Sequence, residues 1–165
     1  MLRVIASPAL QLVAVYFAEY VVSVGWASKS NPKPNKSDWW ATNAYEVLAF
    51  LYQFGVLIAR SSIPFFIIRR ISVLTTLQGL NFVLWGFHAF FLFLPLWLQF
   101  VSMVYCGLLG GFMYVSVFYL LLSDSDSLSA SDRELGINLT SIAVNFGIVT
   151  SSVFELILFN TALKD

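Results

Sequence analysis

Few side chains in this sequence have the chemistry of an active site, and those few lie in apolar surroundings. The chain has one histidine, His88, and one cysteine, Cys106. A Ser-His-Asp triad, a cysteine-rich zinc site and a disulfide framework each need more than these two residues supply. We therefore predict no catalytic residues, no metal site, no cofactor and no enzyme activity.

The most informative polar residue is Glu19, which is the one charge in an apolar run from residue 4 to residue 28. A carboxylate in the middle of a membrane span costs roughly 2.5–3.5 kcal/mol and is rarely kept without a pathway or a partner. Glu46, Arg60 and Glu155 lie nearer the ends of their apolar runs, where long side chains reach the interface. Arg60 is there an anchor or an anion contact.

Other polar residues recur at helical spacing, so that each apolar run has one polar stripe. The stripes are Tyr16, Glu19, Tyr20 and Ser23; Glu46, Gln53 and Arg60; Gln78, Asn81, Trp85 and His88; Gln99, Ser102 and Cys106; and Asn138, Ser141, Asn145, Ser152 and Glu155. Because lipid cannot satisfy polar groups, we expect the stripes to face one another or a wet cavity.

These stripes supply the candidate residues of a transport pathway, with one alternative left open. The candidates are Tyr16, Glu19, Gln53, Arg60, Gln78, Asn81, Asn145 and Glu155. The alternative is that the uncharged ones only join helices to each other, at about 1 kcal/mol each, and that His88 is a packed, hydrogen-bonded histidine.

The composition requires a membrane around these residues. Of the 165 residues 59% are hydrophobic, 17% are aromatic and only 11% are charged, with a mean hydropathy of +0.80. Soluble domains have about a quarter charged residues. The net charge is zero, so no basic field favours nucleic acid. A soluble domain, a disordered chain and a nucleic-acid-binding protein are excluded, and an integral membrane protein remains.

The apolar runs predict one all-α domain over residues 1–165 with about five transmembrane helices. A span needs about 20 apolar residues, and we place spans at about 5–27, 40–63, 71–94, 96–122 and 135–160. Residues 71–123 contain no charge and are too long for one helix, so we place a turn near Pro95. The first run has one alternative, a secretory signal peptide.

Small and capping residues mark contacts and ends. Gly107, Gly110 and Gly111 form a glycine cluster that allows two helix backbones to approach closely, so we assign them to helix packing. Ser131 precedes Glu134 in capping-box spacing and predicts a helix start at Ser131.

The distribution of basic residues gives a weak orientation. Five arginines lie on the side of the N-terminus and four lysines on the other, which favours a cytoplasmic N-terminus and, with five spans, a lumenal C-terminus. The sequence from Asn35 to Ser37 is a glycosylation sequon in the first loop. It is used only if that loop is lumenal, so both signals agree.

Four sequence blocks resemble a known family. AVYFAEY (residues 14–20), LYQFGVLIARSS (51–62), LQGLNFV (77–83) and YCGLLGGFMYV (105–115) occur in this order and are similar to the battenin family of lysosomal or vacuolar membrane proteins. The similarity runs from about residue 13 to residue 148. In this alignment Glu19 matches the acidic residue of the first block, Arg60 the arginine of the second, and Gln78 and Asn81 the polar pair of the third.

The resemblance implies a fold and a function. The five spans correspond to the C-terminal half of a bundle similar to the major facilitator superfamily, so a further helical half is the expected partner, in the same or a separate chain. The expected function is transport of small solutes, glycerophosphodiesters or basic amino acids, across the lysosomal or vacuolar membrane, with a role in the pH of the organelle. A non-transporting scaffold or trafficking protein is the alternative.

Overall fold

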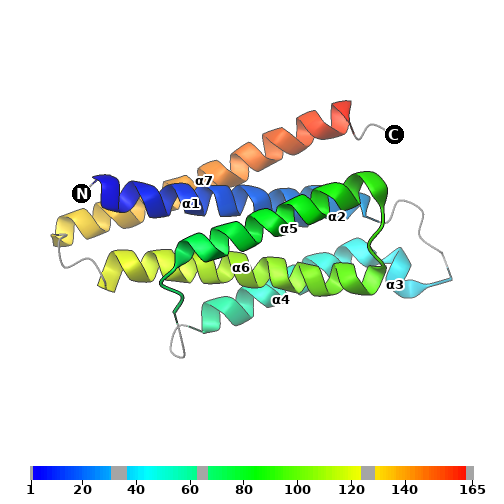
Figure 1. Cartoon of the computed structure of the whole chain (residues 1–165), viewed down its shortest axis with the longest axis horizontal. Coiled ribbons are helices and arrows are strands. Elements are labelled where there is room, and N and C mark those ends of the chain that lie inside the picture. Colours follow the sequence, from blue (N-terminus) through cyan, green and yellow to red (C-terminus); the bar gives the residue numbers. More distant parts are fainter. Residues whose placement is uncertain (1, 31–36, 63–66, 124–128, 163–165) are drawn as a thin grey trace.

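The computed structural model describes residues 2–30, 37–62, 67–123 and 129–162, and every regular element in these ranges is a helix. The elements are α1 (Leu2–Tyr20), the π-helix η1 (Val21–Trp26), α2 (Ala27–Lys29), α3 (Trp39–Thr42), α4 (Ala44–Ser61), α5 (Ile71–Phe91), α6 (Leu96–Ser123) and α7 (Ala130–Thr161). The long helices lie side by side along the molecule, and the two chain ends lie at opposite ends of it (Figure 1). The chain is an all-α membrane bundle.

Three of the described helical segments are long and apolar enough to cross a membrane: Ile5–Lys29, Leu96–Ser123 and Ala130–Thr161. α4 and α5 lie where the sequence predicts two more spans, but neither is among these three segments. α4 carries Glu46 and Arg60, and α5 carries Gln78, Asn81 and His88. The number of five crossings therefore stays a prediction.

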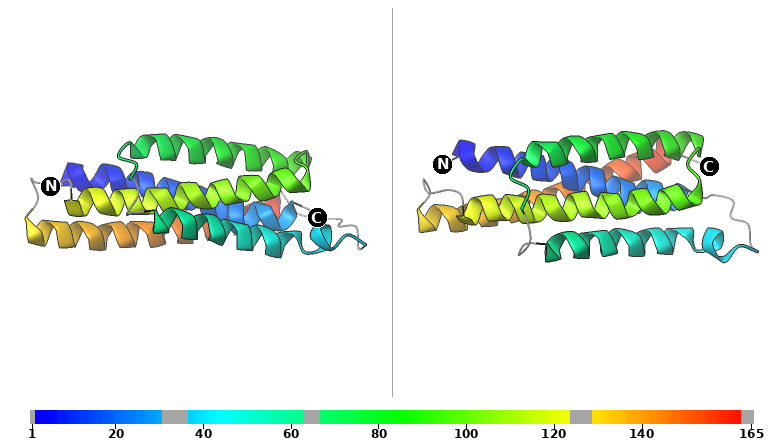
Figure 2. Two further views of the ribbon diagram at one scale, coloured as in Figure 1. Left: turned by 90° about the horizontal axis from the view of Figure 1, so that it is seen from below. Right: turned by 60° about the horizontal axis from the view of Figure 1, so that its bottom comes forward.

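The helices pack around α6 and α1. α6 makes its largest contact with α4, and α1 makes its largest contact with α7; α5 packs on both α1 and α6. The left view in Figure 2 shows α5 on one side of this bundle and α4 and α7 on the opposite side. One apolar core cluster surrounds Trp85 and Met103, and a second surrounds Leu12 and Met113. This arrangement places α1 against α5 and α6, and places η1, which follows α1, against α4.

His88 has a structural position at the turn between α5 and α6. Leu92 is in the left-handed conformation (φ 49°), and its N–H donates to the carbonyl of His88 (2.8 Å). The N–H of Leu94 donates to Nδ1 of His88 (3.1 Å), and Gln99 donates its amide to the carbonyl of Leu94 (2.9 Å). The packed, hydrogen-bonded alternative therefore describes His88 in this structure.

One predicted cap is wrong. The N-cap of α7 is Ser129, whose side chain accepts the N–H of Asp132 (3.2 Å), and the helix is already formed at Ser131. Ser129 and Ser131 both have acidic residues three positions later. The earlier serine caps the helix, because its side chain accepts one of the backbone N–H groups that have no partner in the first turn.

Candidate functional site

The closest helix contact, between α4 and α6, is made by glycines. A Cβ on Gly107 would overlap the carbonyl of Tyr52, and a Cβ on Gly55 would overlap the carbonyl of Val104. A Cβ on Gly111 would lie 2.6 Å from that of Ala59. Glycine is required here because the two backbones touch directly. Gly107 and Gly111 thus lie at a helix contact, and the contact fixes the position of Tyr52.

Glu19 lies inside the bundle, with 1% of its surface exposed. Its carboxylate covers Gly110 of α6, where a Cβ would overlap it, and it accepts a hydrogen bond from the Tyr52 hydroxyl of α4. Gly110 therefore does more than allow helices to pack. The carboxylate of Glu19 occupies the space that a side chain at this position would fill.

Three further polar side chains extend this site toward α5. Gln78 donates its Nε2 to the sulfur of Cys106 (3.2 Å), and the side chain of Asn81 lies beside the same thiol. Cys106 lies one helical turn before Gly110, so it is a neighbour of the carboxylate. We name Glu19, Tyr52, Gln78, Asn81 and Cys106 the Glu19 cluster; all five are buried.

The hydrogen bonding of the Glu19 cluster is incomplete. Among the described residues, Oε2 of Glu19, Oε1 of Gln78 and Nδ2 of Asn81 are buried and have no hydrogen-bond partner. Buried polar atoms are nearly always paired in folded proteins, and an unpaired one costs about 1–3 kcal/mol. Three of the buried unpaired atoms therefore belong to the Glu19 cluster.

Arg60 lies at the edge of this site and is held in a fixed orientation. Its guanidinium donates to the hydroxyl of Tyr16 (3.1 Å) and lies 4.5 Å from the ring centre of Tyr114. Tyr16 is one turn before Glu19 on the same face of α1. The side chain of Arg60 remains exposed, so its charge lies at the surface while that of Glu19 lies inside.

Glu155 forms a separate contact. It is buried on α7 and lies against Gly25 of the π-helix η1, where a Cβ would be 2.7 Å from Cγ of Glu155. This contact joins α7 to η1 and is distinct from the Glu19 cluster. Extra turns of π-helix are rare and occur often at functional sites, and here the segment begins two residues after Glu19.

Three of the five polar stripes face inward and two do not. The stripe residues of α5 and α6 are all buried, and so are Tyr16 and Glu19 of α1 and Ser23 of η1. The stripes of α4 and of most of α7 do not face the other stripes, since Gln53 and Asn145 are exposed; that they face a wet cavity stays a prediction. Periodicity shows which residues share a face but not which way that face points.

Comparisons with known proteins agree with the four sequence blocks. The model of the CLN3 protein family matches residues 3–163. The chain belongs to this family. It is 44% identical to battenin of Dictyostelium discoideum over 163 residues, which are 98% of this chain and 38% of that protein. It is 36% identical to protein btn-1 of Neurospora crassa and to battenin of Canis lupus familiaris, over 89% and 88% of this chain and 32% of each relative.

The CLN3-family match confirms the predicted resemblance and makes the chain a multi-pass membrane protein. The chain spans about a third of the length of these relatives. No solved structure matches it. Much of a relative's length therefore has no counterpart here. The exposed polar side chains of α4 and α7 are not explained by the contacts within this bundle.

Two tyrosines of the site were not predicted: Tyr52, which is hydrogen-bonded to Glu19, and Tyr114, whose ring lies against the guanidinium of Arg60. The signal for Tyr52 was available. Gly55 and Ala59 are small residues one turn apart on α4, a pattern typical of a close helix contact, and Tyr52 lies one turn before Gly55. That face, and not the polar stripe of Gln53, is the inner face of α4.

Proposed function

We propose that this chain forms one helical bundle of a transporter for small solutes in the lysosomal or vacuolar membrane, and that it is not an enzyme. The observation that carries the proposal is the outward position of polar side chains on apolar helices. Gln53, Arg60 and Asn145 are exposed on the bundle, and lipid does not satisfy such groups. Water or further helices must cover them.

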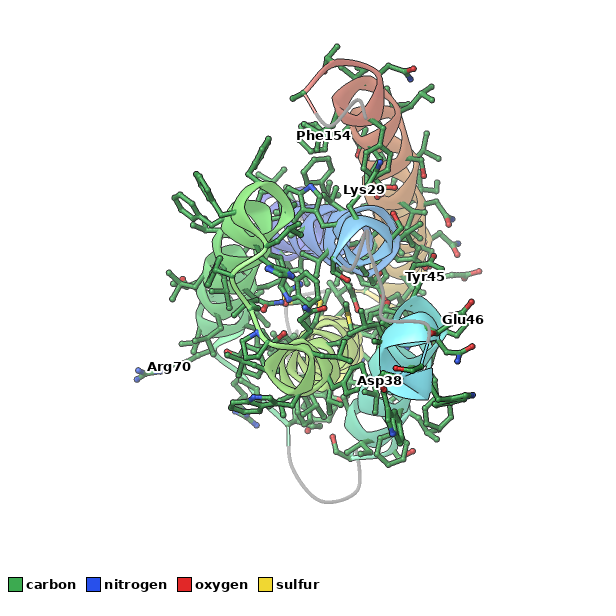
Figure 3. The ribbon with its side chains drawn as sticks, turned by 90° about the vertical axis from the view of Figure 1, so that its right-hand side faces the viewer. Lys29, Asp38, Tyr45, Glu46, Arg70 and Phe154 are labelled. Atoms are coloured by element: carbon green, nitrogen blue, oxygen red, sulfur yellow. The ribbon has the colours of Figure 1, made fainter. Side chains whose placement is uncertain are left out.

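The covering partner is, in this proposal, the helical half that precedes the corresponding region in the relatives. α4 and α7 lie along the same side of the bundle, and Tyr45 and Glu46 of α4 point outward there (Figure 3). Only 17% of the most apolar stretch of α7 is buried, so most of the surface of this helix is free for another contact. Two bundles that rock about a shared central site give alternating access.

The solutes that we propose are glycerophosphodiesters or basic amino acids, with an effect on the pH of the organelle. The family membership supports a membrane function, and the Glu19 cluster supplies a carboxyl group inside the bundle. Gln53, Arg60 and Asn145 form the wall that faces the second bundle, and Gln78, Asn81, Tyr16 and Glu19 lie behind it. Glu155 positions α7 against η1.

The test is transport by the chain with and without its partner. Reconstituted alone in liposomes, the chain should give no saturable flux of glycerophosphodiesters or basic amino acids, because one bundle lacks the facing wall. Fusing it to the N-terminal half of the Dictyostelium relative should restore saturable flux. Saturable uptake by the chain alone would contradict the proposal, and a fusion that folds but never transports would favour the scaffold alternative.

We also propose a cytoplasmic N-terminus and a lumenal C-terminus. The sequon at Asn35 lies outside the described residues, in the segment between α2 and α3. Expressed in a glycosylating cell, the chain should carry a glycan that is lost in Asn35→Gln and kept in Asn138→Gln, measured as the mass shift on deglycosylation. A glycan that depends on Asn138 would invert the topology.

A further inference from the structure

Glu19 lies in the seam between two pairs of helices. The largest helix contacts join α4 to α6 and α1 to α7. Glu19 belongs to α1, but its carboxylate lies on Gly110 of α6 and is hydrogen-bonded to Tyr52 of α4. The side chain therefore reaches from one pair into the other. Because the backbones of α4 and α6 touch through glycines, these two helices keep their relative position, and a movement of one pair against the other changes the surroundings of Glu19.

The closed seam offers little that stabilises a negative charge. The charged and titratable groups packed around Glu19 are Tyr16 and Tyr20 of its own helix, Tyr52 and Arg60 of α4, and Cys106 of α6. Among the described residues α5 adds only neutral amides beside the thiol, and Glu155 of α7 lies apart, against Gly25. Arg60 is the one cation in this set, and its guanidinium is bonded to the hydroxyl of Tyr16 and lies on the ring of Tyr114.

The hydrogen bonds of the Glu19 side chain are those of a neutral carboxyl group. The carboxyl accepts the hydroxyl of Tyr52, while Oε2 is buried and has no partner. A buried carboxylate keeps its charge where a cation or several N–H and O–H donors stabilise it, and otherwise a proton neutralises it. A proton needs neither a cavity nor a set of ligands. Oε2 is the oxygen that remains for it.

We propose that Glu19 is a proton-binding site of the seam between the helix pairs. Its carboxylate takes up one proton on Oε2 while the seam is closed, and releases it when α1 moves away from α4 and α6 and water reaches the group. The step converts a carboxylate to a carboxylic acid and back, and makes or breaks no other covalent bond. The use of this proton to drive solute transport rests on the proposed function; the protonation itself does not.

The experiment is infrared spectroscopy of the chain in lipid nanodiscs at neutral pH, because a carboxylic acid and a carboxylate absorb at different frequencies. The difference spectrum between the unchanged chain and Glu19→Gln should contain the C=O band of one carboxylic acid and no carboxylate bands. Labelling the glutamates with ¹³C should shift this band. The matched control is Glu46→Gln, the same substitution at an exposed glutamate, whose difference spectrum should show the loss of carboxylate bands alone.

Tyr52→Phe decides the question if Glu19→Gln does not fold. It keeps the carboxyl group and removes the hydroxyl that donates to it. The acid band should then remain and move to a higher frequency, because a hydrogen bond to a C=O group lowers its stretching frequency. Carboxylate bands in the Glu19→Gln difference spectrum, or an acid band that is lost or unmoved in Tyr52→Phe, would overturn the proton site. Since this assay involves no transport, its result is independent of the flux test of the proposed function.

Discussion

Replacing Glu19 by lysine should abolish function while the chain still inserts into the membrane. The substitution puts a longer, positively charged side chain against Gly110 and removes the acceptor of the Tyr52 hydrogen bond. It also places a second positive charge near Arg60. A buried charge without its partner costs about 3–5 kcal/mol. We expect transport to fall to background.

The measurement needs the full length of a family member, with the substitution made at the position of Glu19, in cells that lack their own copy. Solute export and organelle pH are the readouts, and membrane fractionation confirms insertion. Glu46→Gln and Glu155→Gln are the controls and should impair function less, because Glu46 is exposed and Glu155 contacts η1. Normal export and normal pH in the lysine variant would show that this carboxylate does not serve the pathway.

The second large effect is expected for Gly107→Leu, which should separate α4 from α6. Any Cβ at Gly107 overlaps the backbone carbonyl of Tyr52, and a backbone cannot yield as a flexible side chain can. Overpacked cores lose typically 1–3 kcal/mol, and we expect about 3 kcal/mol or more here because the most extensive helix contact must open. Tyr52 would then move away from Glu19.

Gly79→Leu is the matched control, since Gly79 lies in the middle of α5 and a Cβ there has no neighbour within 4 Å. Both variants replace a helical glycine by leucine. The difference between their thermal midpoints therefore measures the effect of the contact between α4 and α6. Resistance to proteolysis and the thermal midpoint in nanodiscs measure it. Equal midpoints for Gly107→Leu and Gly79→Leu would contradict the close approach of α4 and α6.

The helical membrane fold could be predicted because it depends on composition and on the length of apolar runs. The inner faces of α1, α5 and α6 were also predictable, since their polar residues share one side of each helix. The direction of the α4 face was not. Gln53 and Arg60 share a face as predicted, but the inner face of α4 is the one with Gly55 and Ala59, which the polar stripe cannot reveal.

The Glu19 cluster could be predicted only in part. Glu19, Gln78 and Asn81 were candidates because polar groups in an apolar run need a reason to be there. Their contact with each other depends on the relative rotation and height of three helices, and on Tyr52 and Cys106, which side-chain type alone does not mark. The space above Gly110 is a property of two helices together and has no signal in either one.

The pairing of α1 with α7 has a consequence for how the protein is made. α7 packs against α1, with Gly136 next to Ile5 and Gly147 next to Val13 and Tyr16. These partners are more than a hundred positions apart in the sequence. During synthesis α1 must therefore wait in the membrane with that side open until the helix beginning at Ala130 arrives. Throughout that interval the face of α1 that later packs on α7 is available to insertion factors, and to the wrong helix.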